Sequence, residues 1–215
     1  MKKSAGWIAA ALLLAFGCDN TERRALDLEA VRVAPNAKLR TDTVDDGAFA
    51  KTATFVLVDA ENAGDDGAYV TLAGQLGDAQ GRAVGQLKPQ SLWLPARGSR
   101  TFALVDQERQ QRPTATTARI VVRSGTIPKR PPVVHVEQIR EIGDHGKLVV
   151  QGVVHNDADR TGQIMVIASF HSVDGQPLTR PFSVLTIPGH GVQPVQFVSK
   201  PGAAHGTIYV GDTSF

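Results

Sequence analysis

Short segments with alternating apolar and polar residues, bounded by glycine, proline, asparagine or aspartate, recur along the chain, and no segment keeps a helical period. In residues 69–76, Val70, Leu72 and Leu76 fall on one side of an extended chain, with Tyr69 on the other. A period of two residues places one side of a strand against a core and the other toward solvent. The chain is therefore predicted to be all-β.

We expect strands in both halves of the chain: at 55–58, 69–76, 91–94, 101–105 and 118–122, and at 133–140, 147–154, 163–171, 182–187, 193–198 and 207–210. Residues 107–111 are polar and precede Pro113, so they are expected to form a loop with one helical turn.

The two halves share turn residues at a nearly constant spacing, which predicts an internal duplication. The spacing is 94 residues at two matches (156 − 62 and 175 − 81) and 95 at a third (197 − 102), as a one-residue loop change would cause. The matched pairs are Asn62 with Asn156, Gly81 with Gly175, and Phe102 with Phe197. The alternative is that two unrelated β domains share turn residues by chance.

A proline-rich segment at 124–132 lies between the halves, and adjacent prolines favour a semi-rigid extended spacer. We expect it to link one Ig-like β-sandwich domain at 28–123 to a second at 133–215, each near the usual size of roughly 100 residues. The chain has one cysteine, so neither domain can contain an inter-sheet disulfide. Burial of aliphatic and phenylalanine side chains must stabilise both.

The N-terminal segment has the organisation of an export signal. Lys2 and Lys3 precede an apolar stretch at 7–16. This stretch is shorter than the roughly 20 residues that a membrane-spanning helix needs.

The single cysteine, Cys18, directly follows this stretch and Gly17, which resembles a bacterial lipoprotein signal, although Ala15 and Phe16 depart from the usual residues. The resemblance implies a signal peptide at 1–17, lipidation of Cys18 and a membrane anchor ahead of a flexible tether at 18–27. The alternative is an ordinary signal peptide with an incidental cysteine near the cleavage site.

Both halves resemble the exported FxLyD-type domain, an Ig-like β-sandwich found in bacterial lipoproteins. The second half carries the turn residues of that pattern at Gly152, Asn156, Asp174, Gly175, Pro188, Gly189 and Phe197, and the first half at Asn62, Asp78, Gly81, Pro95 and Phe102. Both halves depart from the naming motif: Gly74 and Ala168 replace its phenylalanine, and Ser172 replaces its aspartate in the second half. The plant-type LEA domain has a similar pattern.

All six histidines lie in the second half: His135, His145, His155, His171, His190 and His205. Histidines in periplasmic β-sandwiches can bind copper or zinc, but metal sites usually contain closely spaced ligand pairs. No two histidines here are nearer than ten residues, and His145 and His190 lie in glycine-flanked turns that we expect to be exposed. We therefore predict no metal site and no cofactor.

Residues 157–162 resemble the first half of a calcium loop, with Asp157, Asp159 and Gly162 at matching positions. Position twelve, which needs a carboxylate, is Ala168. A polar hairpin loop is the favoured interpretation, and whether the acidic turns at 42–47 and 65–67 bind calcium stays open.

No catalytic motif is present: the sequence contains no Gly-x-Ser-x-Gly elbow, phosphate-binding loop or dinucleotide fingerprint. Lys+Arg 23 against Asp+Glu 21 gives a net charge of +2, too small to attract nucleic acid. The chain is therefore predicted to be neither an enzyme nor a nucleic-acid-binding protein.

Trp93 is the single tryptophan after the leader, between Leu92 and Leu94. If both leucines face a core, alternation turns Trp93 outward, where it could anchor a protein partner or a glycan. The alternative is that Trp93 covers the rim of the sandwich.

These observations predict a lipid-anchored lipoprotein of the cell envelope, facing the periplasm or the exterior, with a non-enzymatic binding or scaffolding role. Its partners would be the membrane, through the lipid on Cys18, and another envelope protein. The alternative function is a periplasmic metal or small-ligand carrier that uses the histidine-rich second half.

Overall fold

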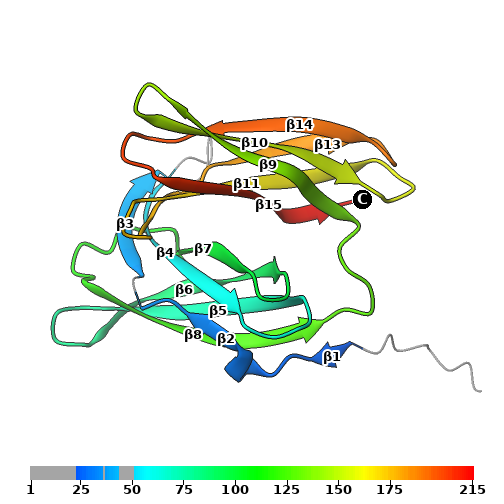
Figure 1. Ribbon diagram of the computed structural model, residues 1–215. Helices are drawn as coiled ribbons and strands as arrows, with labels where there is room; N and C mark the ends of the chain where they lie inside the picture. Colours follow the sequence, from blue (N-terminus) through cyan, green and yellow to red (C-terminus); the bar gives the residue numbers. More distant parts are fainter. Residues whose placement is uncertain (1–22, 36, 44–50) are drawn as a thin grey trace, which may run out of the picture.

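The computed structural model describes residues 23–35, 37–43 and 51–215 (Figure 1). Cys18, the leader at 1–17 and most of the acidic turn at 42–47 lie outside these residues. The described residues form fifteen strands, one short 3-10 helix at Leu28–Ala30 and no α-helix, which confirms the all-β prediction.

Residues 24–127 form two antiparallel sheets. Sheet A has the order β1 (Arg24–Ala25), β8 (Thr117–Ile127), β5 (Ala68–Gly77), β6 (Ala83–Leu94). In sheet B, strand β4 (Thr52–Asn62) lies between β7 (Ser99–Val105) on one side and β2 (Val31–Val33) with β3 (Lys38–Thr43) on the other.

Residues 134–214 form two more antiparallel sheets. Sheet C has the order β14 (Val192–Val198), β10 (Lys147–Asn156), β9 (Val134–Asp144). In sheet D, strand β11 (Gly162–His171) lies between β15 (His205–Ser214) on one side and β12 (Pro177–Thr179) with β13 (Phe182–Ile187) on the other.

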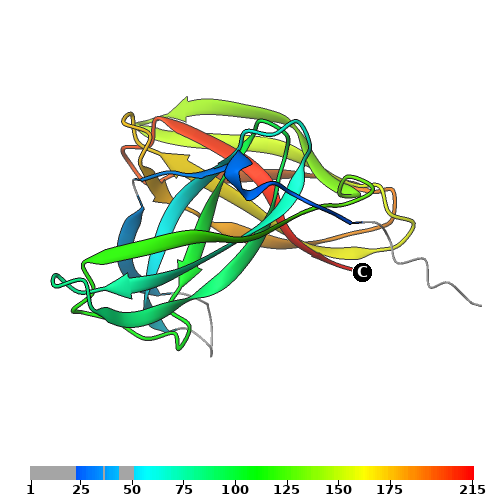
Figure 2. The same ribbon diagram turned by 90° about the horizontal axis from the view of Figure 1, so that it is seen from below.

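Each half buries the alternating apolar side chains of its two sheets against each other, as expected for a sandwich. In the first half Val56 and Phe102 of sheet B share a core with Val70 and Leu92 of sheet A. In the second half Val150 of sheet C and Phe170 of sheet D belong to one core, with further aliphatic residues of both sheets. Figure 1 shows the second half above the first, and Figure 2 shows the first half in front.

The strand order of sheet B recurs in sheet C, with β4 and β10 at the centre, and that of sheet A recurs in sheet D except for β1, with β5 equivalent to β11. The clearest equivalence is between Asn62 and Asn156, both fully buried at the end of the central strand of their sheet. Each side-chain amide donates to the carbonyl four residues later and to a proline carbonyl, Pro95 or Pro188. Each Oδ1 accepts from the backbone N–H two residues later. The two asparagines thus close the same corner.

The phenylalanines matched in the sequence do not occupy equivalent positions. Phe102 lies opposite Val58 and Phe197 opposite Val150. Val58 precedes its corner asparagine by four residues, and Val150 by six. A two-residue displacement leaves each side chain on the same face of its strand, so the alternation pattern could not reveal it.

Two boundaries also differ from expectation. Strand β8 continues to Ile127, so residues 124–127 of the expected linker pair within sheet A. Residues of the expected tether belong to the fold as well, because Arg24 and Ala25 pair with β8 and Leu26 is buried in the first core. A polar segment that adds to an exposed strand edge has no apolar signature of its own.

The two halves contact each other through the outer face of sheet D. Ile167 of β11 and Tyr209 of β15 are almost fully buried and pack with the core of the first half. The Tyr209 hydroxyl donates to the Thr101 carbonyl at 2.7 Å, which also accepts from Nε of Arg180 at 2.7 Å. Strand β11 is therefore covered on both faces.

Candidate metal centre

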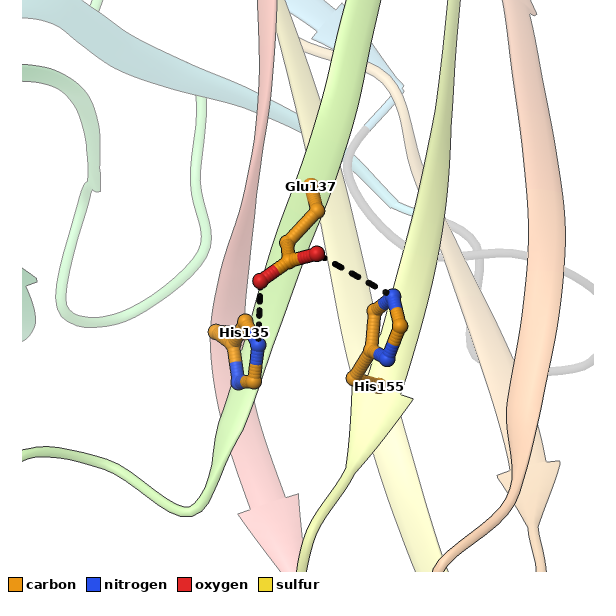
Figure 3. A group of neighbouring side chains, drawn as sticks. All are labelled: His135, Glu137 and His155. Carbon is orange, nitrogen blue, oxygen red and sulfur yellow. Dashed lines mark hydrogen bonds and ion pairs between the residues drawn. The ribbon is translucent and has the colours of Figure 1, made fainter.

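The β9–β10 hairpin brings together two histidines that are twenty residues apart in the sequence. In the antiparallel ladder His135 lies directly opposite His155. Glu137 follows His135 by two residues on the same strand, so alternation puts its side chain on the same outer face of sheet C. Figure 3 shows the three side chains converging from the two strands.

The polar atoms of these side chains lie within reach of one another. Nε2 of His135 is 3.2 Å from Oε1 of Glu137, and Nε2 of His155 is 3.6 Å from Oε2. One ligand atom from each of the three residues lies within 4.8 Å of the others. The imidazole rings stack with centroids 5.2 Å apart and planes 9° from parallel.

His155 contributes a polar atom without a hydrogen bond. Its Nε2 is buried and has no hydrogen-bond partner among the described residues. Most buried polar atoms in proteins are hydrogen-bonded, and each exception calls for an explanation. An ion bound between the imidazole and the Glu137 carboxylate would provide one.

Asp157 approaches His135 from the opposite side of the ring. Its Oδ2 lies 3.4 Å from Nδ1 of His135. In this structure Nε2 of His135 donates to the Glu137 carboxylate, so a metal ion on Nε2 would replace that proton. A carboxylate beside Nδ1 favours a proton on that nitrogen when Nε2 binds a metal ion, and Asp157 is placed to orient His135 in this way.

Two imidazoles and one carboxylate are ligands that Zn²⁺ and Cu²⁺ accept. A tetrahedral Zn²⁺ with bonds of about 2.0–2.1 Å holds its ligand atoms about 3.3 Å apart. The lone pairs of parallel imidazoles do not converge on one point. Coordination of a single ion by both His135 and His155 would therefore require at least one ring to rotate out of the stack. Three ligands from the chain would leave one coordination position for water.

Wide spacing in the sequence does not keep these histidines apart in the fold, because His135 and His155 meet across the β9–β10 ladder with Glu137 beside them. A partial signal was present in the sequence, because the two histidines lie at the outer ends of two consecutive expected strands. The hairpin turn pairs Asp144 with Lys147, and the bulge between Gln151 and Val153 then shifts the pairing by one residue, so that His135 lies opposite His155.

The other four histidines also lie beside carboxylates, but none of these pairs gathers three ligands. His145 contacts Asp144 in an exposed turn, and His190 lies 3.0 Å from Asp159, also exposed, as expected. His205 lies 3.9 Å from Glu141, and His171 contacts Asp59 of the first half. Asp157 and Asp159 of the calcium-like loop thus lie beside histidines.

Trp93 projects from β6 on the outer face of sheet A, because Leu92 and Leu94 are buried. It lies opposite Tyr69 in the ladder, with ring centroids 5.3 Å apart in an edge-to-face arrangement. Trp93 is partly exposed and also covers Gly67. It is therefore turned outward, with part of its surface packed.

No family model matches the chain, and no curated protein sequence matches it. Among solved structures, red sea bream transglutaminase is similar at 12% identity and a TM-score of 0.25, over 78% of this chain and 27% of that chain. The chain thus spans about a quarter of that protein. The CBM22-1–CBM22-2 tandem domain of Paenibacillus barcinonensis Xyn10C is similar at 6% identity and a TM-score of 0.16, over 88% of each chain.

Scores this low identify neither a fold family nor an activity, and the FxLyD resemblance stays a prediction. Within the described part of the chain, no helix has the length and apolar character needed to cross a membrane.

Proposed function

We propose that this protein is a non-enzymatic envelope protein whose second half binds a divalent transition-metal ion, Zn²⁺ or Cu²⁺, through His135, Glu137 and His155. The observation that carries the proposal is the buried Nε2 of His155, which has no hydrogen bond among the described residues and lies 3.6 Å from the Glu137 carboxylate, beside a second imidazole. Of the two functions expected from the sequence, this geometry favours the metal carrier over the scaffold.

The position of the group suits reversible binding rather than a structural role. The three side chains lie on the outer face of sheet C, away from the core of the second half. Glu137 is largely exposed, so an ion can enter without opening the sandwich. Sites of this kind generally bind Cu²⁺ with higher affinity than Zn²⁺.

Calorimetric titration of the protein with Zn²⁺ and with Cu²⁺ tests this proposal. We expect one ion per chain and a loss of affinity of about tenfold or more in His155→Ala and in Glu137→Gln. His205→Ala is the matched control, because His205 is an exposed strand histidine outside the group. Absence of a stoichiometric transition, or equal losses in the control, would contradict the proposal.

The role of Asp157 is tested separately. Asp157→Asn keeps all three ligands but removes the carboxylate beside His135, and a loss of about 10-fold to 100-fold in affinity is expected. NMR of the imidazole nitrogens should show a metal-bound Nε2 on His135 and a retained proton on Nδ1. Metal on Nδ1 would rule out the orienting role.

Anchoring through Cys18 is the second part of the proposal, and its support is the cysteine's position after the apolar leader. Two or more acyl chains give stable membrane attachment, whereas one does not. Cys18→Ser is therefore expected to move the protein from the membrane fraction to the soluble envelope fraction. A variant that partitions like the parent would exclude the lipid anchor.

We also propose that the halves are two tandem Ig-like domains derived by duplication. The recurring strand order and the equivalent corners at Asn62 and Asn156 support this origin.

A further inference from the structure

An open groove of about 530 Å³ crosses the outer face of sheet A, far from the histidine group in the sequence and on other strands. Its floor includes the small or apolar side chains of Ala73, Val121 and Pro89. Its polar lining consists of amides and guanidinium groups: Gln75, Gln86, Gln107, Arg119 and Arg123.

The two arginines of this groove are available to a ligand. Neither Arg119 nor Arg123 has an ion pair or side-chain hydrogen bond among the described residues, and no acidic residue lines the groove. The nearby carboxylates of Asp106 and Glu108 are paired with Arg112. The groove therefore presents unneutralised positive charge.

An aromatic pair continues the same face. Alternation along β5 turns Tyr69, Thr71, Ala73 and Gln75 outward, while Val70 and Leu72 are buried. Tyr69 and its partner Trp93 thus lie four residues from the groove floor, a distance of about 13 Å along a strand. Tyr69 is 42% exposed.

We propose that this outer face of sheet A binds an acidic oligosaccharide. Aromatic and apolar surfaces pack against the C–H faces of sugar rings, and glutamine amides both donate to and accept from hydroxyl groups. Arginine pairs in bidentate fashion with carboxylate or sulfate groups on the sugar. An oligosaccharide several sugars long can reach from Tyr69 to Arg119.

The groove lies on the face of sheet A and presents side chains, which suits a saccharide. Strand addition by an acidic peptide would instead use the main-chain groups at the open edge of β8, because β1 pairs with β8 only at Thr126 and Ile127. A nucleic acid is bound through many neutralised phosphates. This face offers two free arginines and the chain has a net charge of +2.

Binding of a galacturonic acid hexamer, measured by calorimetry, tests the proposal. We expect binding that weakens by about tenfold or more in Arg119→Ala/Arg123→Ala and that weakens with added salt. We expect Tyr69→Ala to weaken it severalfold. Arg130→Ala is the matched control, because Arg130 is an exposed arginine of the linker. Thermal unfolding of each variant verifies that it is folded.

Two comparison ligands test whether the site prefers acidic sugars and whether it prefers sugars to peptides. A neutral cellohexaose should bind more weakly than the galacturonate, and a hexaglutamate peptide should bind more weakly still. Equal affinity for the neutral sugar would overturn the acidic specificity, and tighter binding of the peptide would overturn the saccharide class. No galacturonate binding, or equal binding by the double variant, would overturn the site.

Discussion

Nε2 of His171 lies 3.1 Å from both carboxylate oxygens of Asp59, which joins the second half of the chain to the first. The Thr101 hydroxyl also donates to Asp59. Both side chains of the pair are about four-fifths buried, with exposed fractions of 19% and 21%. This contact lies beside the buried Tyr209 and Ile167, so polar and apolar contacts together hold the halves in one arrangement.

We expect the two residues to be energetically coupled. A double-mutant cycle of Asp59→Ala and His171→Ala should give a coupling free energy of about 1 kcal/mol, typical of a partly buried hydrogen-bonded pair. The free energy of unfolding in urea measures it. Additive effects of the two substitutions would show that the pair does not stabilise the contact between the halves.

The corner asparagines should be costly to replace. Asn156 donates to the carbonyls of Arg160, Ile187 and Pro188, and Asn156→Ala leaves these groups without the amide. We expect a loss of about 2–3 kcal/mol in the free energy of unfolding, because buried acceptors are left unpaired. Asn62→Ala should be comparably destabilising.

The control for these substitutions is Gln163→Ala, since Gln163 is an exposed strand residue. It should change stability by about 0.5 kcal/mol or less. Losses of this small size in the asparagine variants would contradict the structural role of the corners.

Asp106 is expected to make stability depend on acid pH. Burial acts to raise the pKa of Asp106, but hydrogen bonds from Arg112 and from the backbone of Gln110 and Glu108 lower it overall. A carboxyl whose folded-state pKa is lowered contributes stability above its unfolded pKa of about 3.9, and this contribution disappears as pH falls through the folded pKa.

Asp106→Asn should therefore lower the free energy of unfolding at neutral pH by about 1–3 kcal/mol. The difference from the parent should shrink as pH falls below about 4. Urea unfolding across this range provides the measurement. A difference that stays constant with pH would mean that the charge of Asp106 contributes no stability.

Trp93 offers a spectroscopic test of the packing on sheet A. A β-carbon on Gly67 would lie 2.3 Å from Cζ2 of Trp93, so Gly67→Ala should displace the indole. We expect a red shift of the tryptophan emission and stronger quenching by acrylamide in protein without the leader, because Trp7 is then removed.

Gly143→Ala is the matched control for this experiment, because its β-carbon would meet no atom within 4 Å. An unchanged emission in Gly67→Ala would indicate that the indole does not rest on Gly67.

Strands with clear alternation could be predicted because each side chain's burial follows from its own position in the sequence. The expected strand at 182–187 agrees with β13, and the strand at 163–171 differs from β11 by one residue. Strands β1, β2 and β12 have two or three residues, too short for a period to be recognised.

The candidate site could not be predicted in the same way, because it depends on pairing between strands. Individual histidines are visible in the sequence, but the meeting of His135 with His155 depends on the register of the β9–β10 ladder, which contains a bulge between Gln151 and Val153. Such an irregularity changes which residues are opposite one another.

The sequence by itself thus determined the all-β class, since the alternation of a strand is a local property, whereas the outward side of Trp93 depended on the burial of Leu92 and Leu94. Only the tertiary structure decided that His135, Glu137 and His155 share one surface, and that Ile167 and Tyr209 pack with the core of the first half. The physical reason is that strand register and the packing of one sheet on another arise from contacts between distant segments, which no local period encodes.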